Sequence, residues 1–154
     1  MKKRFKTLPF IISIAFTAVL YSCLTNQVES KYSNFDSAQK EMLFGRGWIP
    51  SELVYESMED IYQRTNVEKN TCIFSFNLSK KDLKLVLKKA ESTSIKIEMP
   101  TGITRPIWWT KSISGLDQKF LVDQDNIVVY LVIDEKENRI YGWRNLTNYN
   151  PLNN

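Results

Sequence analysis

The residues best suited to covalent chemistry in this chain are its two cysteines, Cys23 and Cys72. Histidine is absent, which removes the commonest general base and the commonest metal ligand. Cys72 falls on the apolar side of an alternating segment, and no histidine is available to lower its pKa. We therefore expect Cys72 to be a buried, inert thiol and not a nucleophile.

The carboxylates suggest metal binding or acid–base catalysis, but their spacing favours neither. The run Asp123-Gln124-Asp125-Asn126 has oxygen ligands at alternate positions, as calcium loops do. It lacks the glycine and the distant glutamate of an EF-hand loop, so we expect a plain turn without a metal. Glu59-Asp60 and the pair Glu135/Glu137 are better explained by solvated strand edges and turns. The sequence predicts no catalytic residue and no cofactor, and we expect a protein that is not an enzyme.

The adjacent Trp108 and Trp109, with Arg105 nearby, are the candidate partner-contact residues. Neighbouring side chains of an extended chain point in opposite directions, so one ring can enter the core while the other stays exposed. Exposed aromatic and arginine side chains anchor protein–protein contacts. The alternative is that both rings pack over the end of a sheet.

The amino-terminal segment has the layout of a secretory leader. Residues 1–6 are basic without an acid, and residues 8–20 form an apolar run shorter than the roughly 20 residues of a membrane-spanning helix. The run ends in Leu20-Tyr21-Ser22-Cys23, which resembles the lipobox of bacterial lipoproteins, although Tyr21 is larger than usual at its position. This resemblance implies that residues 1–22 are removed and that a lipid on Cys23, including a palmitate-type acyl chain, holds the protein on a membrane.

Removal of the leader changes the charge argument. Four of the 21 basic residues and none of the 17 acidic residues lie in positions 1–22, so the remainder carries 17 of each. A neutral domain lacks the basic surface that nucleic-acid binding requires, so we expect no nucleic-acid partner. The remaining 132 residues suit one domain with a single core.

Two hairpins are expected from the alternation of apolar and polar residues. Residues 71–78 place Cys72, Phe74, Phe76 and Leu78 on one face, as a half-buried strand does, and residues 58–65 are the economical partner. Residues 126–133 are apolar on both faces, as in a central strand, and residues 139–144 return after a polar turn.

One amphipathic helix is expected directly after the first hairpin. Ser79-Lys80-Lys81-Asp82 is a helix-capping pattern, and Leu83, Val86, Leu87 and Ala90 then fall on one side. We therefore predict an α+β fold, a mostly antiparallel sheet of about four to six strands with this helix packed on one face. The domain is expected over residues 35–146, after a lipidated cysteine and polar tether at 23–34 and before a frayed tail at 147–154.

The segment around residues 45–78 resembles the YbbD-type head domain of bacterial proteins. The resemblance rests on Arg46-Gly47-Trp48-Ile49-Pro50, followed by Ser57, Ile61, Asn66 and Asn70. Two positions depart from the pattern, because Tyr55 replaces a second proline and Tyr62 replaces a histidine. The resemblance implies a domain type but no activity, and any role of that histidine does not transfer.

Together these features favour a membrane-anchored envelope lipoprotein that acts as a non-enzymatic binding or structural module, with the membrane and an envelope protein as partners. In a source with two membranes, the absence of aspartate after Cys23 favours the outer membrane. One alternative is a small inhibitor or phage or toxin exclusion factor. Another is a hydrolase that uses carboxylates alone, which requires two convergent acids in a cleft.

Overall fold

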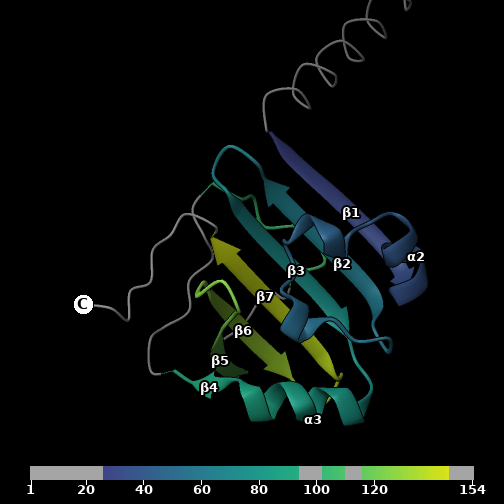
Figure 1. Ribbon diagram of the computed structural model, residues 1–154, viewed down its shortest axis with the longest axis vertical. Helices are drawn as coiled ribbons and strands as arrows, with labels where there is room; N and C mark the ends of the chain where they lie inside the picture. Colours follow the sequence, from purple (N-terminus) through teal and green to yellow (C-terminus); the bar gives the residue numbers. More distant parts are fainter. Residues whose placement is uncertain (1–25, 94–101, 110–115, 146–154) are drawn as a thin grey trace, which may run out of the picture.

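The fold is dominated by one antiparallel sheet, seen in a computed structural model that describes residues 26–93, 102–109 and 116–145 (Figure 1). Its seven strands lie in the order β1-β2-β3-β7-β6-β5-β4. The strands are β1 (Gln27–Asn34), β2 (Glu59–Asn66), β3 (Thr71–Asn77), β4 (Glu91–Ser92), β5 (Asp117–Val122), β6 (Val128–Asp134) and β7 (Arg139–Asn145). The helices are α2 (Phe35–Lys40) and α3 (Lys80–Lys89), with 3₁₀ turns η1 (Phe44–Arg46) and η2 (Ser51–Leu53).

The two hairpins expected from the sequence are confirmed. β2 pairs with β3 around a turn in which Asn70 has a φ of 48°, and the Asn66 side chain accepts a hydrogen bond from the Lys69 amide. β6 pairs with β7 around a turn in which Asp134 accepts two amide hydrogen bonds. β7 also pairs with β3, which joins the two hairpins into one sheet.

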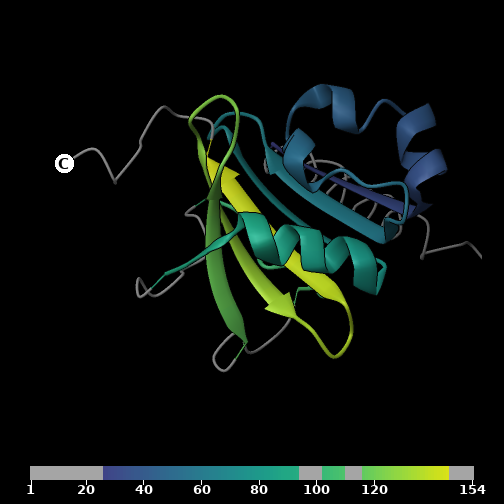
Figure 2. The same ribbon diagram turned by 60° about the horizontal axis from the view of Figure 1, so that its bottom comes forward.

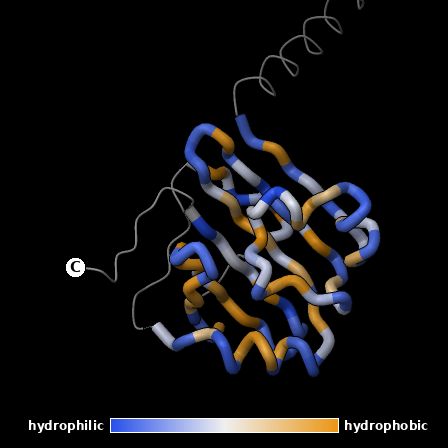
Figure 3. The backbone as a smooth tube through the Cα atoms, viewed as in Figure 1, coloured by the Kyte–Doolittle hydropathy of each residue, from blue (hydrophilic) through white to orange (hydrophobic). Residues whose placement is uncertain are grey.

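One face of the sheet, here called the helix face, carries Phe74, Phe76, Leu131 and Ile140, all fully buried. Two parts of the chain cover it. Residues 35–58, with α2 and the two 3₁₀ turns, lie over the β1–β3 side, and α3 lies across the other part (Figure 2). Hydrophobic residues accordingly follow the central strands and one side of α3 (Figure 3).

The opposite face, here called the loop face, holds a second apolar cluster. Ile73, Val132 and Trp143 pack there against Ile103 and Trp109 from the loop that crosses the sheet. β3 is therefore buried on both faces, and the expectation that it is half-buried is wrong. Thr71 and Ser75, on the face of β3 opposite Phe74, are 2% and 0% exposed.

α3 begins where the capping pattern places it. The Ser79 hydroxyl accepts a hydrogen bond from the Asp82 amide, and the Ser57 hydroxyl donates to the Asp82 carboxylate. The hydrogen bond from Ser57 holds the pKa of Asp82 below its usual value. Leu83 and Val86 turn toward the core, as predicted.

The α+β assignment, however, is wrong. The described residues form a mostly β structure with seven strands, and only α3 is a helix of more than six residues. Ten residues of α3 bury too few side chains to form a layer over such a sheet, and irregular chain covers much of the helix face instead.

The tether assignment is also corrected, because residues 27–34 form β1 and pair along their length with β2. β1 carries few apolar residues, so its sequence lacks the signal of a core strand. It is held by backbone pairing at the edge, where neither face must be fully apolar. The leader, Cys23 and the tail at 147–154 lie outside the described residues.

Candidate functional site

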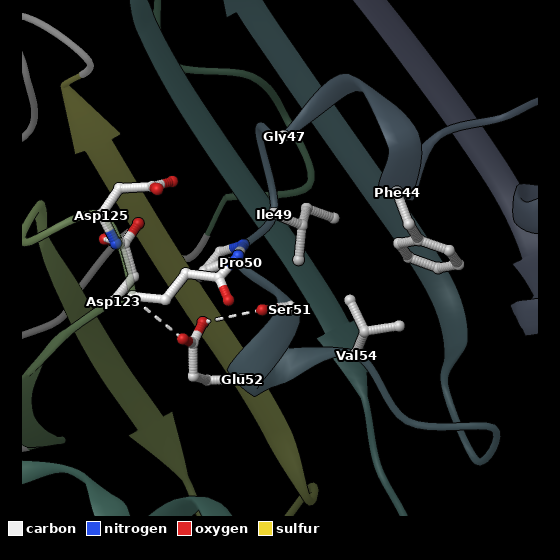
Figure 4. Close-up of a pocket in the computed structure, with 10 residues that line it drawn as sticks. Phe44, Gly47, Ile49, Pro50, Ser51, Glu52, Val54, Asp123 and Asp125 are labelled. Carbon is white, nitrogen blue, oxygen red and sulfur yellow. Dashed lines mark hydrogen bonds between the residues drawn. The ribbon is translucent and has the colours of Figure 1, made fainter.

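A pocket of about 370 Å³ lies between the segment 44–54 and the turn that joins β5 to β6. Its large apolar side chains lie mainly on one side, here called the floor, and its carboxylates lie mainly on the other, here called the rim (Figure 4). It is lined by Phe44, Gly47, Ile49, Pro50, Ser51, Glu52, Val54, Asp123, Gln124 and Asp125. The pocket thus joins the Arg46–Pro50 motif to the carboxylates at 123–125, two features far apart in the sequence.

A buried arginine on β7 ties the two sides of the pocket together. Arg144 is 3% exposed, and its guanidinium forms a 2.5 Å ion pair with Asp123 and donates to the Gly47 carbonyl. Both partners line the pocket. Gly47 has a φ of 70°, the left-handed region that favours glycine, which lets the chain turn so that its carbonyl faces the guanidinium.

Glu52 forms the second link across the pocket. One carboxylate oxygen accepts the Gln124 amide at 2.9 Å, and the other accepts the Ser51 hydroxyl at 3.3 Å (Figure 4). η2 supplies Glu52, and the β5–β6 turn supplies Gln124. This contact and the Arg144 contacts fix both sides of the pocket independently of any ligand.

The carboxylates of Glu52, Asp123 and Asp125 therefore line one pocket, but Glu52 and Asp123 already have structural partners. Asp123 pairs with Arg144 and also accepts the amides of Asp125 and Ile127, which closes the turn as predicted. Asp125 remains at the exposed rim. Within the described parts of the chain, no group of three histidine, cysteine or acidic residues could hold a metal ion.

Cys72 lies on the helix face of β3 and is fully buried, as expected. Burial raises the pKa of its thiol strongly, although the neighbouring Arg144 acts in the opposite direction. A thiol that stays protonated is a poor nucleophile, so Cys72 is suited to packing and not to covalent catalysis.

The structure separates the candidate contact residues Arg105, Trp108 and Trp109. Trp109 is 2% exposed and packs edge-on against Tyr141 and Trp143, so it belongs to the core. Trp108 is half-buried, stacks on Tyr62 with ring centres 5.4 Å apart, and donates to Glu29. Arg105 is exposed on the same loop, away from the pocket lining.

The family comparison matches the first three strands of this architecture. Residues 26–77 match the family model of the YbbD head domain, which confirms the resemblance seen at residues 45–78. The matched region contains β1, β2, β3 and the segment that covers them. No curated protein sequence and no solved structure matches the chain.

The motif residues of this family have structural roles here. The Gly47 carbonyl accepts a hydrogen bond from Arg144, and the Ser57 hydroxyl supports the α3 cap by accepting the Ser79 amide and donating to Asp82. Asn66 and Asn70 shape the β2–β3 turn. Tyr62, at the position of the family's histidine, stacks on Trp108.

Sequence reasoning missed Arg144, the residue that organises the pocket. A signal was present, because Ile140, Gly142 and Arg144 alternate on β7 and therefore share the helix face. A charged residue at such a position needs a buried partner. The sequence could not identify Asp123 as that partner, because the two meet only when β5, β6 and β7 pair.

Among the described residues, no helix combines the length and apolar character needed to cross a membrane.

Proposed function

We propose that this chain is a lipid-anchored binding module of the cell envelope, and that its pocket receives a segment of a partner protein. The segment would place an apolar side chain on the pocket floor and a lysine or arginine at the acidic rim. The observation that carries this proposal is that an apolar floor and the carboxylates of Glu52 and Asp125 line one pocket, which hydrogen bonds hold across.

The floor favours an apolar group for a simple reason. Phe44 and Val54 are only partly buried and lie beside the buried Ile49, so an inserted side chain would remove their remaining apolar surface from water. The pocket is also preorganised by the contacts of Arg144 and Glu52, which lowers the entropy lost on binding.

The rim favours a cation. Arg144 neutralises Asp123, but Glu52 and Asp125 have no cation paired with them in the described residues. A lysine or arginine near these two carboxylates would gain electrostatic attraction, which chiefly adds specificity and association rate.

The same contacts argue against the carboxylate-only hydrolase. General acid–base catalysis needs carboxylates that can exchange protons with a substrate. Asp123 is occupied by an arginine and two amides, and Glu52 by an amide and a hydroxyl, which leaves Asp125 without a second unoccupied acid in the pocket.

Anchoring through Cys23 would hold this module close to a membrane. Because β1 begins at Gln27, only residues 24–26 separate Cys23 from the sheet. Three residues span roughly 10 Å when fully extended. The partner would therefore be a protein of the same membrane surface or one that approaches it.

The test is photocrosslinking in intact cells with a benzophenone amino acid at Phe44, on the pocket floor. The control carries the same group at Met42, which is 71% exposed and does not line the pocket. We expect a protein adduct at Phe44 that is absent at Met42, and that is lost with Asp125→Lys but kept with Glu137→Lys on the β6–β7 turn. Adducts that are equal at both positions, or unaffected by Asp125→Lys, would contradict the proposal.

The anchor is tested separately with Cys23→Ser. We expect this variant to leave the membrane fraction while the pocket stays intact. Unchanged membrane retention would rule out lipidation at Cys23 without affecting the pocket assignment.

A further inference from the structure

The sheet has one long open edge among the described residues. Its two edge strands are β4, with two residues, and β1, with eight. β1 pairs only with β2, and it lies at the outer border of the sheet (Figure 1). An edge strand presents a row of unpaired N–H and C=O groups, which is a template for a further strand.

β1 also carries several exposed side chains along this edge. Val28 is 53% exposed, and Glu29 and Lys31 are exposed on the other side of the strand. β1 contains no proline, a residue that protects many natural sheet edges from further pairing.

We propose that two copies of this chain pair through β1, antiparallel and centred on Ser30, to form a continuous sheet of fourteen strands, seven from each copy. This inference concerns a surface separate from the pocket, because no pocket-lining residue belongs to β1. It therefore does not depend on the proposed function.

The side chains of β1 are complementary to themselves in this register. A twofold axis at Ser30 sets Glu29 opposite Lys31 of the second copy, and this pair occurs twice. The same axis sets Val28 opposite Tyr32 of the second copy, so the exposed valine meets an aromatic ring. Opposite charges and aromatic–β-branched pairs are favourable cross-strand neighbours.

The faces of the sheet agree with this pairing. Val28 and Tyr32 lie on the helix face, because Tyr32 pairs with Ile61 and packs on that core. Glu29 and Lys31 lie on the loop face, opposite Arg64 and Tyr62 of β2. Each cross-copy pair therefore joins side chains on the same face, as an antiparallel sheet requires.

Neighbouring registers are unfavourable. In a symmetric antiparallel pair the axis must pass through a residue, because directly opposed side chains share a face. An axis at Glu29 would oppose two glutamates, and an axis at Lys31 would oppose two lysines. Like charges directly opposite each other destabilise a sheet, so the register centred on Ser30 is favoured over both.

Glu29 has capacity for the additional contact. It accepts two N–H groups of Arg64 on one carboxylate oxygen and the Trp108 indole N–H on the other. A carboxylate has about four acceptor positions, so one is left for Lys31 of the second copy. Arg64 and Trp108 also fix the orientation of Glu29, which lowers the entropy that the new contact would cost.

Disulfide crosslinking tests the register in membranes of cells that express the full chain. In the proposed pair, the two Ser30 Cα atoms are about 4.5–5.5 Å apart, within the range of a disulfide. The control residue Ser33 lies three positions from the axis, so its two copies are roughly 20 Å apart. We expect an oxidised dimer with Ser30→Cys and none with Ser33→Cys.

Three results would overturn the proposal: no dimer with Ser30→Cys, equal crosslinking of both variants, or a Ser30→Cys adduct with a different protein. Cys23 and Cys72 are present in both variants, so they cannot account for a difference between them.

A charge variant provides the second test. Lys31→Glu would place a negative charge opposite Glu29 of the second copy, and this repulsion would occur twice in the dimer. We therefore expect the dimer dissociation constant to rise by about tenfold or more. The control is Lys40→Glu, which makes the same charge change at an exposed lysine of α2. Analytical ultracentrifugation of the purified full chain measures both. Equal effects of the two variants, or a monomeric parent chain at micromolar concentration, would also overturn the proposal.

Discussion

At the scale of single residues, the ion pair between Arg144 and Asp123 is the contact that most distinguishes this molecule. Both side chains are at least 97% buried, and Arg144 also reaches the Gly47 carbonyl. A buried pair of this kind adds little net stability compared with apolar residues, but removing one partner leaves an uncompensated buried charge. The role of this pair is to fix the position of the Arg46–Pro50 segment relative to the β5–β6 turn.

Asp123→Asn should therefore destabilise the protein markedly. The amide retains the shape of the carboxylate but leaves the Arg144 charge unpaired, so we expect a loss of about 3–5 kcal/mol in the free energy of unfolding. The matched control is Asp117→Asn at the start of β5, where the Asp117 side chain is 41% exposed and pairs with Lys119. That change should cost less than about 1 kcal/mol. Urea unfolding measures both, and equal losses would contradict the role of the buried pair.

At the scale of elements, the close contact of β3 with β7 depends on one glycine. Gly142 lies opposite Phe74, and the ring of Phe74 occupies the space above it. A Cβ added at Gly142 would lie 2.4 Å from two ring atoms of Phe74 and 3.1 Å from a Leu131 methyl carbon. The absence of a side chain at Gly142 therefore leaves room for the Phe74 ring in the centre of the sheet.

Gly142→Ala should displace this ring. Overpacking a core of this kind costs about 1–3 kcal/mol, which we expect as a lower free energy of unfolding in urea. Gly45→Ala is the control, because an added Cβ there meets no atom within 4 Å. If the two variants unfold at the same urea concentration, the contact between Phe74 and Gly142 does not constrain the sheet.

At the scale of the whole molecule, a loop crosses the sheet and closes a second core. Residues 102–109 are hydrogen-bonded to β1 and β2: Gln27 donates to the Gly102 carbonyl, and Arg64 to the Thr104 carbonyl. These bonds hold Trp109 over Tyr141 and Trp143 of β7. One loop thus joins the family-matched strands to the remainder of the sheet.

Trp109→Ala should remove most of the second core. Deleting a buried tryptophan costs about 3–5 kcal/mol, and we expect this loss in thermal or urea unfolding of the full chain. Ile107→Ala, two positions earlier on the same loop, should change stability by less than about 0.5 kcal/mol because Ile107 is fully exposed. Comparable losses at both positions would show that the loop does not pack as described.

The local elements follow from the sequence because their causes are local. Alternation at residues 71–78, the turn residues Asn70 and Asn138, and the Ser79 cap each specify backbone geometry within a few positions. Those features predicted both hairpins and α3. Residues near 45–78 also carry enough of a motif for the amino-acid sequence alone to indicate the YbbD head domain.

Other features depend on contacts between distant segments, and only the tertiary structure decided them. β1 is polar and looks like a tether, but it is a strand because β2 offers an open edge for backbone pairing. Thr71 and Ser75 look solvent-facing, but they are buried because the sheet and its crossing loop enclose them.

The pocket is the clearest case of this division. The apolar character of residues 44–54 and the carboxylates at 123–125 are plain in the sequence. Their meeting requires β5, β6 and β7 to pair and Arg144 to find Asp123 and Gly47. The sequence by itself determined which side chains could form a binding site. Long-range strand pairing decided which of them came together, because hydrogen bonds between strands act over any separation along the chain.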